Sequence, residues 1–184
     1  PLVSLINPQP QSWHNETSIN LQYLPEDNNA TLQWCDLYIN DVYNNTQILR
    51  PSGVVSNYLL SGLVEGTYYW NWACFDWDNN GANSTHWNFT IDLTPKTTNI
   101  LVPAEGDTFN YSQILFNMTG ADAMSPNLTC AIDLDGVIIA NQTIQNDTNL
   151  TYIQYNVSDG IHYWNATCVD LAGNSNTTNT RNFT

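Results

Sequence analysis

The sequence predicts an all-β protein built from two tandem antiparallel β-sandwiches, and three observations support this. One stretch occurs twice: residues 66–76 read GTYYWNWACFD and residues 160–170 read GIHYWNATCVD. Within both copies apolar and polar side chains alternate with the two-residue period of a strand that buries one face. Short alternating segments recur between turn-forming residues along the rest of the chain, and none has the period of a helix.

The repetition extends over the whole chain and sets the domain boundaries. Aligning Cys35 with Cys130 gives an offset of 95 residues, which becomes 94 after one deletion. So many matches at alternating positions indicate a duplicated unit. We therefore predict two domains, residues 1–93 and 94–184, each large enough for one modest core.

Each repeat is expected to form seven short strands, the number found in many antiparallel sandwiches. Pro, Asn, Asp and Gly at the intervening positions supply the turns. In repeat 1 the expected strands are residues 2–6, 18–23, 31–40, 46–49, 57–60, 66–76 and 85–91. In repeat 2 they are residues 98–102, 113–119, 127–134, 137–143, 149–155, 160–169 and 179–184.

The four cysteines fall two to a repeat, Cys35 with Cys74 and Cys130 with Cys168. This predicts one disulfide within each domain and an oxidising compartment. Zinc is a poorer explanation, because neither a C-x-x-C pair nor clustered histidines accompany the cysteines. Closing a loop of about forty residues is expected to stabilise each domain by about 4 kcal/mol.

The charge of the chain excludes nucleic acid as a partner. Three basic residues stand against seventeen acidic ones, giving a net charge of -14, so phosphate backbones would be repelled. Only 11% of the residues are charged, so solubility must come from neutral polar side chains or from groups attached to them. No apolar run reaches about 18 residues, so we expect no membrane span in this segment, and no signal peptide is recognisable.

Acceptor sites for N-glycosylation, N-x-[ST], are unusually frequent. With 27 Asn and 31 Ser or Thr among 184 residues, chance predicts about four or five such sites, and fifteen occur. Several alternate out of phase with core positions, which predicts that their asparagines face solvent. We therefore expect heavy N-glycosylation and an extracellular, cell-surface location. The acceptors are Asn15, Asn29, Asn44, Asn83, Asn88, Asn110, Asn117, Asn127, Asn141, Asn146, Asn149, Asn156, Asn165, Asn176 and Asn182.

Three stretches carry a family resemblance: YWNWACFD at residues 69–76, YWNATCVDLAGN at 163–174 and DLTP at 92–95. With them the whole chain resembles the immunoglobulin-like and fibronectin type III-like repeats of microbial, especially archaeal, surface proteins. The resemblance implies two Ig-like sandwiches in a protein of a surface layer, an adhesin or an extracellular filament. The proline of the short linker, Pro95, favours an extended path between the domains.

The chain departs from antibody domains in two respects. The first cysteine of each repeat falls on the third strand rather than the second, so we expect the disulfide to join neighbouring strands of one sheet. The position two residues before the later cysteine holds Trp72 or Ala166, so no tyrosine corner is expected. Both departures argue against antibody-type partner binding.

One segment superficially resembles a calcium-binding loop, Asp76-Trp77-Asp78-Asn79-Asn80-Gly81. Its candidate ligands are Asp76, Asp78 and Asn80, because alternate oxygen side chains and a glycine can wrap a hard cation. The glutamate that completes such loops is missing, and repeat 2 offers only DLAGN at this place. We therefore expect a hairpin turn, with no metal and no cofactor besides covalent glycans.

Tryptophan is concentrated in repeat 1, which holds six of the seven. Because flat aromatic rings stack on sugars, these residues raise the possibility of a glycan ligand. Trp70, Trp72 and Trp87 are in phase with the core and are expected to serve packing. The three out of phase, which are candidates for contact with a ligand or a neighbouring subunit, are Trp13, Trp34 and Trp77.

Catalysis has no support in the sequence, so the chain is not expected to be an enzyme. His14, His86 and His162 are isolated, and no nucleophile motif occurs. His162 takes the place of Tyr68, which favours a structural role.

The sequence as a whole predicts a structural subunit or segment of a heavily N-glycosylated surface assembly. Such a chain would associate with itself into a filament or lattice through sandwich contacts or strand donation, with residues 2–6 and 179–184 as candidate donors. A glycan- or host-surface-binding adhesin module and a passive spacer of a larger secreted protein are the alternatives. Phe183-Thr184 matches Phe89-Thr90, after which repeat 1 continues, so we expect a longer parent chain.

Overall fold

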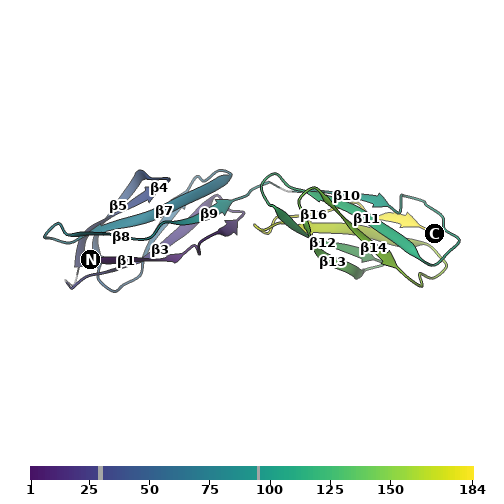
Figure 1. Ribbon diagram of the computed structural model, residues 1–184, viewed down its shortest axis with the longest axis horizontal. Coiled ribbons are helices and arrows are strands. Elements are labelled where there is room, and N and C mark those ends of the chain that lie inside the picture. Colours follow the sequence, from purple (N-terminus) through teal and green to yellow (C-terminus); the bar gives the residue numbers. More distant parts are fainter. Residues whose placement is uncertain (29–30, 95) are drawn as a thin grey trace. The chain divides into compact units, whose positions relative to one another are not determined.

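The computed structural model describes residues 1–28, 31–94 and 96–184, which form strands and turns and no helix. Asn29 and Pro95, expected as a glycosylation site and as part of the linker, lie outside the described residues. The chain divides into two compact units, Pro1–Leu93 and Thr94–Thr184. Within each unit the strands form two layers (Figure 1). The prediction of an all-β protein with sandwich architecture is confirmed.

The first domain packs a three-stranded sheet against a larger one. The smaller sheet has the order β1-β3-β6, and the larger has the order β2-β9-β7-β4-β5 with β8 also paired to β7. The strands in its described residues are β1 (Leu2–Asn7), β2 (Ser12–His14), β3 (Ser18–Glu26), β4 (Thr31–Ile39), β5 (Val42–Pro51), β6 (Ser56–Ser61), β7 (Gly66–Phe75), β8 (Gly81–Asn83) and β9 (Trp87–Ile91).

The second domain repeats this topology. Its smaller sheet has the order β10-β11-β14, and its larger sheet has the order β13-β12-β15-β16 with β17 also paired to β15. The strands are β10 (Thr97–Val102), β11 (Ile114–Ala121), β12 (Asn127–Leu134), β13 (Val137–Gln145), β14 (Thr148–Gln154), β15 (His162–Val169), β16 (Ser175–Thr177) and β17 (Arg181–Phe183).

The two cores are built from the same strands but filled differently. In the first core Trp72 is fully buried and its ring stacks on Tyr23, with centroids 4.1 Å apart. The equivalent positions in the second core hold Ala166 and Met118, both fully buried. The first domain therefore depends on large aromatic rings at places where the second uses small or flexible side chains.

A disulfide joins neighbouring strands of the larger sheet in each domain, as expected. Cys35 on β4 bonds to Cys74 on β7, and Cys130 on β12 bonds to Cys168 on β15. In both pairs the two residues lie directly opposite each other in the strand register.

Two features of the strands differ from expectation. The expected last strands correspond to β9 and β17, and each is preceded by a short unexpected strand, β8 or β16. The first domain also has the unexpected strand β2, which pairs with β9 in parallel. Prolines at positions 8 and 10 cannot donate hydrogen bonds, so β1 ends there, and the chain crosses to the other sheet before pairing again.

The terminal segments expected as strand donors are already paired within their own domains. β1 lies against β3 and buries Val3 and Leu5 in the first core. β17 lies against β15 and buries Phe183 in the second core. Donating either segment to another copy would remove core side chains from its own domain. Strand donation by these residues stays a prediction.

Candidate functional site

The outer face of the larger sheet in the first domain carries aromatic side chains, and we call it the aromatic face. Residues of β5, β4, β7 and β8 lie side by side across it in register. The first row consists of Ile48, Trp34, Phe75 and Gly81. The second row consists of Thr46, Asp36, Ala73 and Asn83, and the third of Tyr43, Tyr38 and Asn71.

Phe75 is held on this face from two sides. Its ring stacks on that of Trp34, with centroids 4.9 Å apart and planes 20° apart. On the other side it lies over Gly81, where an added Cβ would come within 2.6 Å of the Phe75 ring atom Cε1. Gly81 is therefore needed for the close approach of the ring, as glycine in a strand often is.

A shallow hollow of about 320 Å³ lies on the aromatic face beside Ala73, and we call it the Ala73 hollow. Its lining combines two aromatic rings with amide, imidazole and carboxylate groups. The lining residues besides Ala73 are Tyr38, Asp41, Asn71, Phe75, Asn83 and His86. A small hollow with rings and convergent polar groups suits a small amphipathic ligand such as a sugar ring.

The equivalent face of the second domain carries threonine, and we call it the threonine face. Its rows are Thr143, Thr129, Val169 and Ser175; Asn141, Ala131, Thr167 and Thr177; and Ile138, Asp133 and Asn165. The hydroxyls of Thr129 and Thr143 lie 3.2 Å apart, and those of Thr167 and Thr177 lie 2.8 Å apart. The bond between Thr167 and Thr177 lies at the positions that Ala73 and Asn83 occupy in the first domain, where they line the hollow.

The candidate glycosylation sites lie at the surface to different degrees. Of the fourteen in the described residues, none is buried. Eight are exposed, namely Asn15, Asn44, Asn83, Asn110, Asn127, Asn141, Asn149 and Asn156. Six are half-buried, namely Asn88, Asn117, Asn146, Asn165, Asn176 and Asn182.

Three of the half-buried glycosylation-site asparagines already form hydrogen bonds through their side-chain amides within the fold. Asn146 donates from Nδ2 to the carbonyl oxygen of Asp122, 2.6 Å away, and its Oδ1 accepts from the Asp122 N–H at 2.8 Å. The Nδ2 of Asn182 donates to Glu105, and the Oδ1 of Asn88 accepts from the Gln11 N–H. Since Nδ2 is the atom that carries a glycan, these bonds compete with modification at Asn146 and Asn182.

Not all the phase-based expectations for these asparagines hold. Asn88, Asn117 and Asn165 were expected to reach solvent, but they are half-buried, and Oδ1 of Asn117 is buried without a hydrogen-bond partner. Alternation correctly places each side chain on the outer face. It does not show how far neighbouring side chains cover that face.

The three tryptophans singled out as contact candidates lie in different settings. Trp34 is half-buried on the aromatic face, Trp13 is half-buried on β2, and Trp77 is exposed in the turn after β7. Among the described residues no ring contact joins any two of them. The ring that stacks on Trp34 is instead that of Phe75, which was not among the contact candidates. Only the strand register reveals that these two residues are neighbours.

The calcium-like segment forms a turn in which Asp76 bonds to its own loop. Asp76 Oδ1 accepts from the N–H groups of Asp78 and Asn80, at 2.9 and 2.8 Å, and Oδ2 accepts from Asn80 Nδ2 at 2.8 Å. The Asn80 side chain contributes most to lowering the pKa of Asp76. Asp170 and Asn174 form the same turn in the second domain. The oxygens thus close a turn, as the hairpin interpretation expects.

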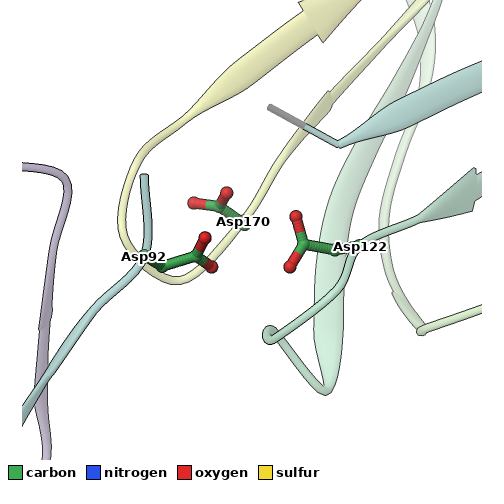
Figure 2. Close-up of side chains that lie close together, drawn as sticks. All are labelled: Asp92, Asp122 and Asp170. Atoms are coloured by element: carbon green, nitrogen blue, oxygen red, sulfur yellow. The ribbon is translucent and has the colours of Figure 1, made fainter. Parts of the chain in front are cut away.

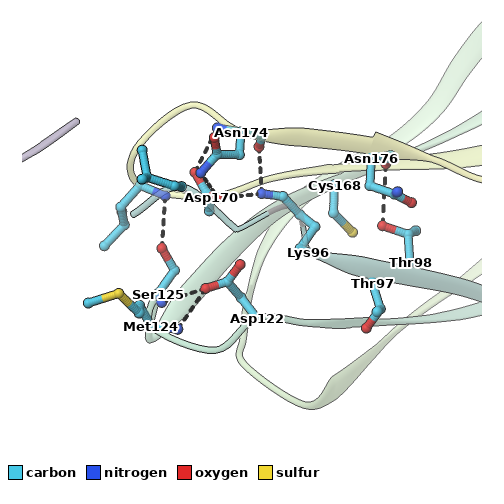
Figure 3. Close-up of polar contacts among 12 residues, drawn as sticks. Lys96, Thr97, Thr98, Asp122, Met124, Ser125, Cys168, Asp170, Asn174 and Asn176 are labelled. Atoms are coloured by element: carbon cyan, nitrogen blue, oxygen red, sulfur yellow. Dashed lines mark hydrogen bonds and ion pairs between the residues drawn. The ribbon is translucent and has the colours of Figure 1, made fainter. Parts of the chain in front are cut away.

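Asp170 also anchors Lys96 near the start of the second domain. The Nζ of Lys96 lies 2.8 Å from Asp170 Oδ2, and neither side chain is exposed. The same ammonium donates to the carbonyl oxygen of Asn174 (Figure 3). Burial raises the pKa of Asp170, but the hydrogen bonds from Lys96 and Asn174 outweigh it and lower the pKa overall. Removing either partner would leave a buried charge unpaired.

Asp122 lies close to this pair, with a carboxylate oxygen within 4.8 Å of one of Asp170 (Figure 2). Asp92, also drawn there, belongs to the first domain. Asp122 Oδ1 accepts from the N–H groups of Met124 and Ser125, both at 2.8 Å. The Lys96 ammonium already supplies positive charge at this place. We therefore assign these carboxylates a structural role.

The first domain does have a tyrosine corner, contrary to expectation. The Tyr68 hydroxyl donates to the Val64 carbonyl oxygen at 3.0 Å and accepts from the Val64 N–H at 3.1 Å. Its ring stacks on Phe89, with centroids 5.4 Å apart. The prediction was wrong because it considered the position two residues before Cys74, whereas the corner residue stands six before it.

His162 forms the equivalent corner in the second domain. Its Nε2 lies 2.8 Å from the Ser158 carbonyl oxygen, and its Nδ1 lies 2.6 Å from Asp135 Oδ2. Its ring stacks on Phe183, with centroids 5.4 Å apart. Hydrogen bonds to Asp135 and Ser158 raise the pKa of His162, against the smaller effect of burial. This supports the expected structural role.

The remaining histidines have separate surroundings. His86 Nε2 lies 3.3 Å from Asp41 Oδ1 at the surface. His14 Nε2 lies 2.9 Å from the Ser12 hydroxyl, and burial lowers the pKa of His14. Within the described residues no acidic group bonds to Nδ1 of His14, so this pair of Ser12 and His14 lacks the orienting partner of a catalytic triad.

The residues that the structure describes include no helix capable of crossing a membrane.

No family model and no curated protein matches the sequence. Among solved structures, the fibronectin(III)-like modules of Clostridium thermocellum CbhA align with a TM-score of 0.63 and 14% identity, covering 98% of this chain and 92% of theirs. The FN1-FN3 domains of chicken CNTN1 align with a TM-score of 0.47 and 10% identity, covering 96% of this chain and 66% of theirs. The CbhA likeness shows that this chain has the fold of tandem fibronectin type III-like modules.

Proposed function

We propose that the chain is a structural segment of a heavily N-glycosylated extracellular assembly, either a filament or a surface layer. The observation that carries this proposal is the placement of the glycosylation sites. All fourteen described acceptors have at least partial exposure, and they are spread over both domains. Two disulfides add to the argument, since such bonds persist in oxidising compartments outside the cytosol.

Self-association has a candidate surface on the outermost strands of the larger sheets, β5 and β13. Each begins with two apolar side chains at equivalent places, Val42 and Tyr43 on β5 and Val137 and Ile138 on β13. These four are 55 to 67% exposed. A repeated apolar pair beside an unpaired strand edge is suited to contact with another copy of the chain.

Such contacts would use side chains rather than continuous strand addition. The register between β4 and β5 shifts at Leu37/Tyr38, and that between β12 and β13 shifts at Ile132/Asp133. Irregularities of this kind twist an edge and hinder extended pairing with a further strand. The adhesin alternative has weaker support, because Trp13, Trp34 and Trp77 do not form one exposed cluster.

Electron microscopy of the native glycosylated protein at low and high concentration tests the proposal. We expect filaments or a lattice for the unaltered chain and their loss in a variant with Tyr43→Lys and Ile138→Lys. Val64→Lys is the matched control, because Val64 is equally exposed but lies outside the strands. Monodisperse particles at every concentration would contradict assembly and leave a spacer or a binding module.

A further inference from the structure

We propose that the Ala73 hollow binds the first sugar of an N-glycan carried by Asn83. This inference rests on the proposed function, because it requires N-glycosylation of the chain. It goes further by giving the aromatic face a particular occupant, a covalently attached pyranose ring from the same chain.

The attachment point lies at the hollow itself. Asn83, in the acceptor Asn83-Ser84-Thr85, stands on β8 directly opposite Ala73 and lines the hollow. Its side chain is exposed, and its amide has no hydrogen-bond partner among the residues that the structure describes. A sugar bonded to Nδ2 therefore starts at the rim, and no existing hydrogen bond has to break.

The chemistry of the lining fits a pyranose ring, which has a face of C–H groups and a rim of hydroxyls. The rings of Phe75 and Tyr38 offer apolar surface, while Asn71, His86 and Asp41 offer hydrogen-bonding groups. A volume of about 320 Å³ is at the low end for ligand pockets, which suits one sugar rather than a chain of them.

The aromatic wall is fixed before any sugar arrives. Trp34 stacks on one side of Phe75, and the bare Cα of Gly81 receives the other side. A ring held in this way loses little conformational freedom when a ligand packs against it. The stack is thus suited to orient a sugar that is already tethered nearby.

The second domain supplies an internal contrast. Positions equivalent to Asn83, Phe75 and Ala73 hold Thr177, Val169 and Thr167, so both the acceptor and the aromatic ring are replaced there. The hydroxyls of Thr167 and Thr177 bond to each other across this place. The acceptors on the threonine face lie elsewhere, for example Asn141 opposite Ala131. An acceptor thus stands beside a phenylalanine ring at position 83, whereas the equivalent position of the second domain has neither.

Nuclear magnetic resonance of the glycosylated full chain tests the proposal. We expect cross-relaxation between protons of the sugar on Asn83 and the rings of Phe75 or Tyr38, and ring-current shifts of those sugar protons. Phe75→Val should abolish the shifts; the variant is expected to fold, because valine occupies this position in the second domain. The glycan on Asn141 is the internal control and should show neither effect.

A second measurement tests the same contact through stability. Thr85→Ala removes the acceptor while keeping Asn83. Loss of the glycan should raise the unfolded-to-folded ratio at fixed denaturant about two- to tenfold when Phe75 is present. The same loss should have little effect in the Phe75→Val background. Equal effects in both backgrounds would overturn the proposal.

Mass spectrometry of glycopeptides distinguishes failure of this inference from failure of the proposed function. If Asn83 is modified but its sugar protons show no contact with either ring, the hollow is not the binding place. If Asn83 is bare while Asn127 and Asn141 are modified, this inference falls and the proposed function stands. If no asparagine carries a glycan, both fall.

Discussion

The outer faces of the two larger sheets differ, although the strands beneath them pair residue for residue in the same way. Trp34 and Phe75 stack on the aromatic face, while the same positions on the threonine face hold Thr129 and Val169. The inner faces keep their apolar character in both domains. Burial constrains the inner positions to apolar side chains, whereas the outer positions are free to specialise. The difference therefore indicates where the two domains act differently.

The corners at the starts of β7 and β15 also differ between the two domains, and here the difference is one of charge. In the first domain Tyr68 forms the corner and Asn40 Oδ1 accepts from the Tyr69 N–H. In the second domain His162 forms it, and Asp135 takes the part of Asn40 by accepting from the Tyr163 N–H. A neutral pair in one domain is replaced by an ionisable pair in the other. The second domain should therefore respond to pH where the first does not.

The largest expected effect comes from the contrast between the cores. Trp72→Ala should destabilise the first domain by about 3–5 kcal/mol, because it leaves a cavity beside Tyr23. Denaturant unfolding followed by tryptophan fluorescence measures this, since six of the seven tryptophans lie in the first domain. A loss below about 1 kcal/mol would mean that the core can collapse around the position, as it has around Ala166.

A double-mutant cycle sharpens the contrast between the outer faces. Gly81→Ser should cost about 1–3 kcal/mol, because the new Cβ would lie 2.6 Å from the fixed Phe75 ring. In a Phe75→Val background the same change should cost much less, since Val169 and Ser175 coexist in the second domain. Additive effects in chemical denaturation would show that the ring does not require the glycine.

The next effect distinguishes structural asparagines from those free to carry a glycan. In the chain made without glycans, Asn146→Ala should destabilise the second domain by about 1–2 kcal/mol, because both hydrogen bonds to Asp122 are lost. Asn141→Ala, at an exposed position of β13, is the control and should change stability by less than about 0.5 kcal/mol. Similar losses in thermal unfolding of the two variants would contradict the distinction.

The smallest effect is a pH dependence from the corner of the second domain, which the corner of the first domain lacks. Both ring nitrogens of His162 face acceptors, so both hydrogen bonds form only when the ring is protonated. The pKa of His162 is raised in the fold. Its contribution is therefore complete below the ordinary pKa of histidine and is lost as pH rises through the folded value. Because Asp135 is partly exposed, we expect about 0.5–1 kcal/mol.

Urea unfolding of the second domain at pH 5.5 and 8.5 measures this effect. The unaltered domain should be the less stable at pH 8.5. His162→Tyr, which installs the residue of the first domain, should remove the dependence, because tyrosine does not titrate in this range. An unchanged pH profile in that variant would show that another group is responsible.

The sequence was sufficient to predict the fold, because strand phase and repetition are local signals. Alternation around Cys35 and Cys74 identified two strands, and the duplicated unit indicated two sandwiches. On β7, however, the outward Asn71 and Ala73 are buried as well as the inward residues, because neighbouring side chains cover them. The extra strands β8 and β16 and the parallel pairing of β2 depend on the path of the chain between strands. Local patterns do not contain that information.

The candidate site depended on neighbours distant in sequence. Alternation placed Trp34 on the outer face, but only the register between β4 and β7 brings it against Phe75, and only the next pairing places Gly81 under the ring. The bond from Asn182 to Glu105 likewise joins residues 77 positions apart. Sequence patterns identified the acceptors. Tertiary contacts distinguish those that are engaged from those that are free.

Glycopeptide mass spectrometry of the protein from its native source is the decisive test of a glycosylated surface. We expect glycans on exposed acceptors of both domains, including Asn83, Asn127 and Asn141, and low occupancy at Asn146 and Asn182, whose amides are engaged. Unmodified asparagine at all fifteen acceptors would contradict a glycosylated extracellular assembly.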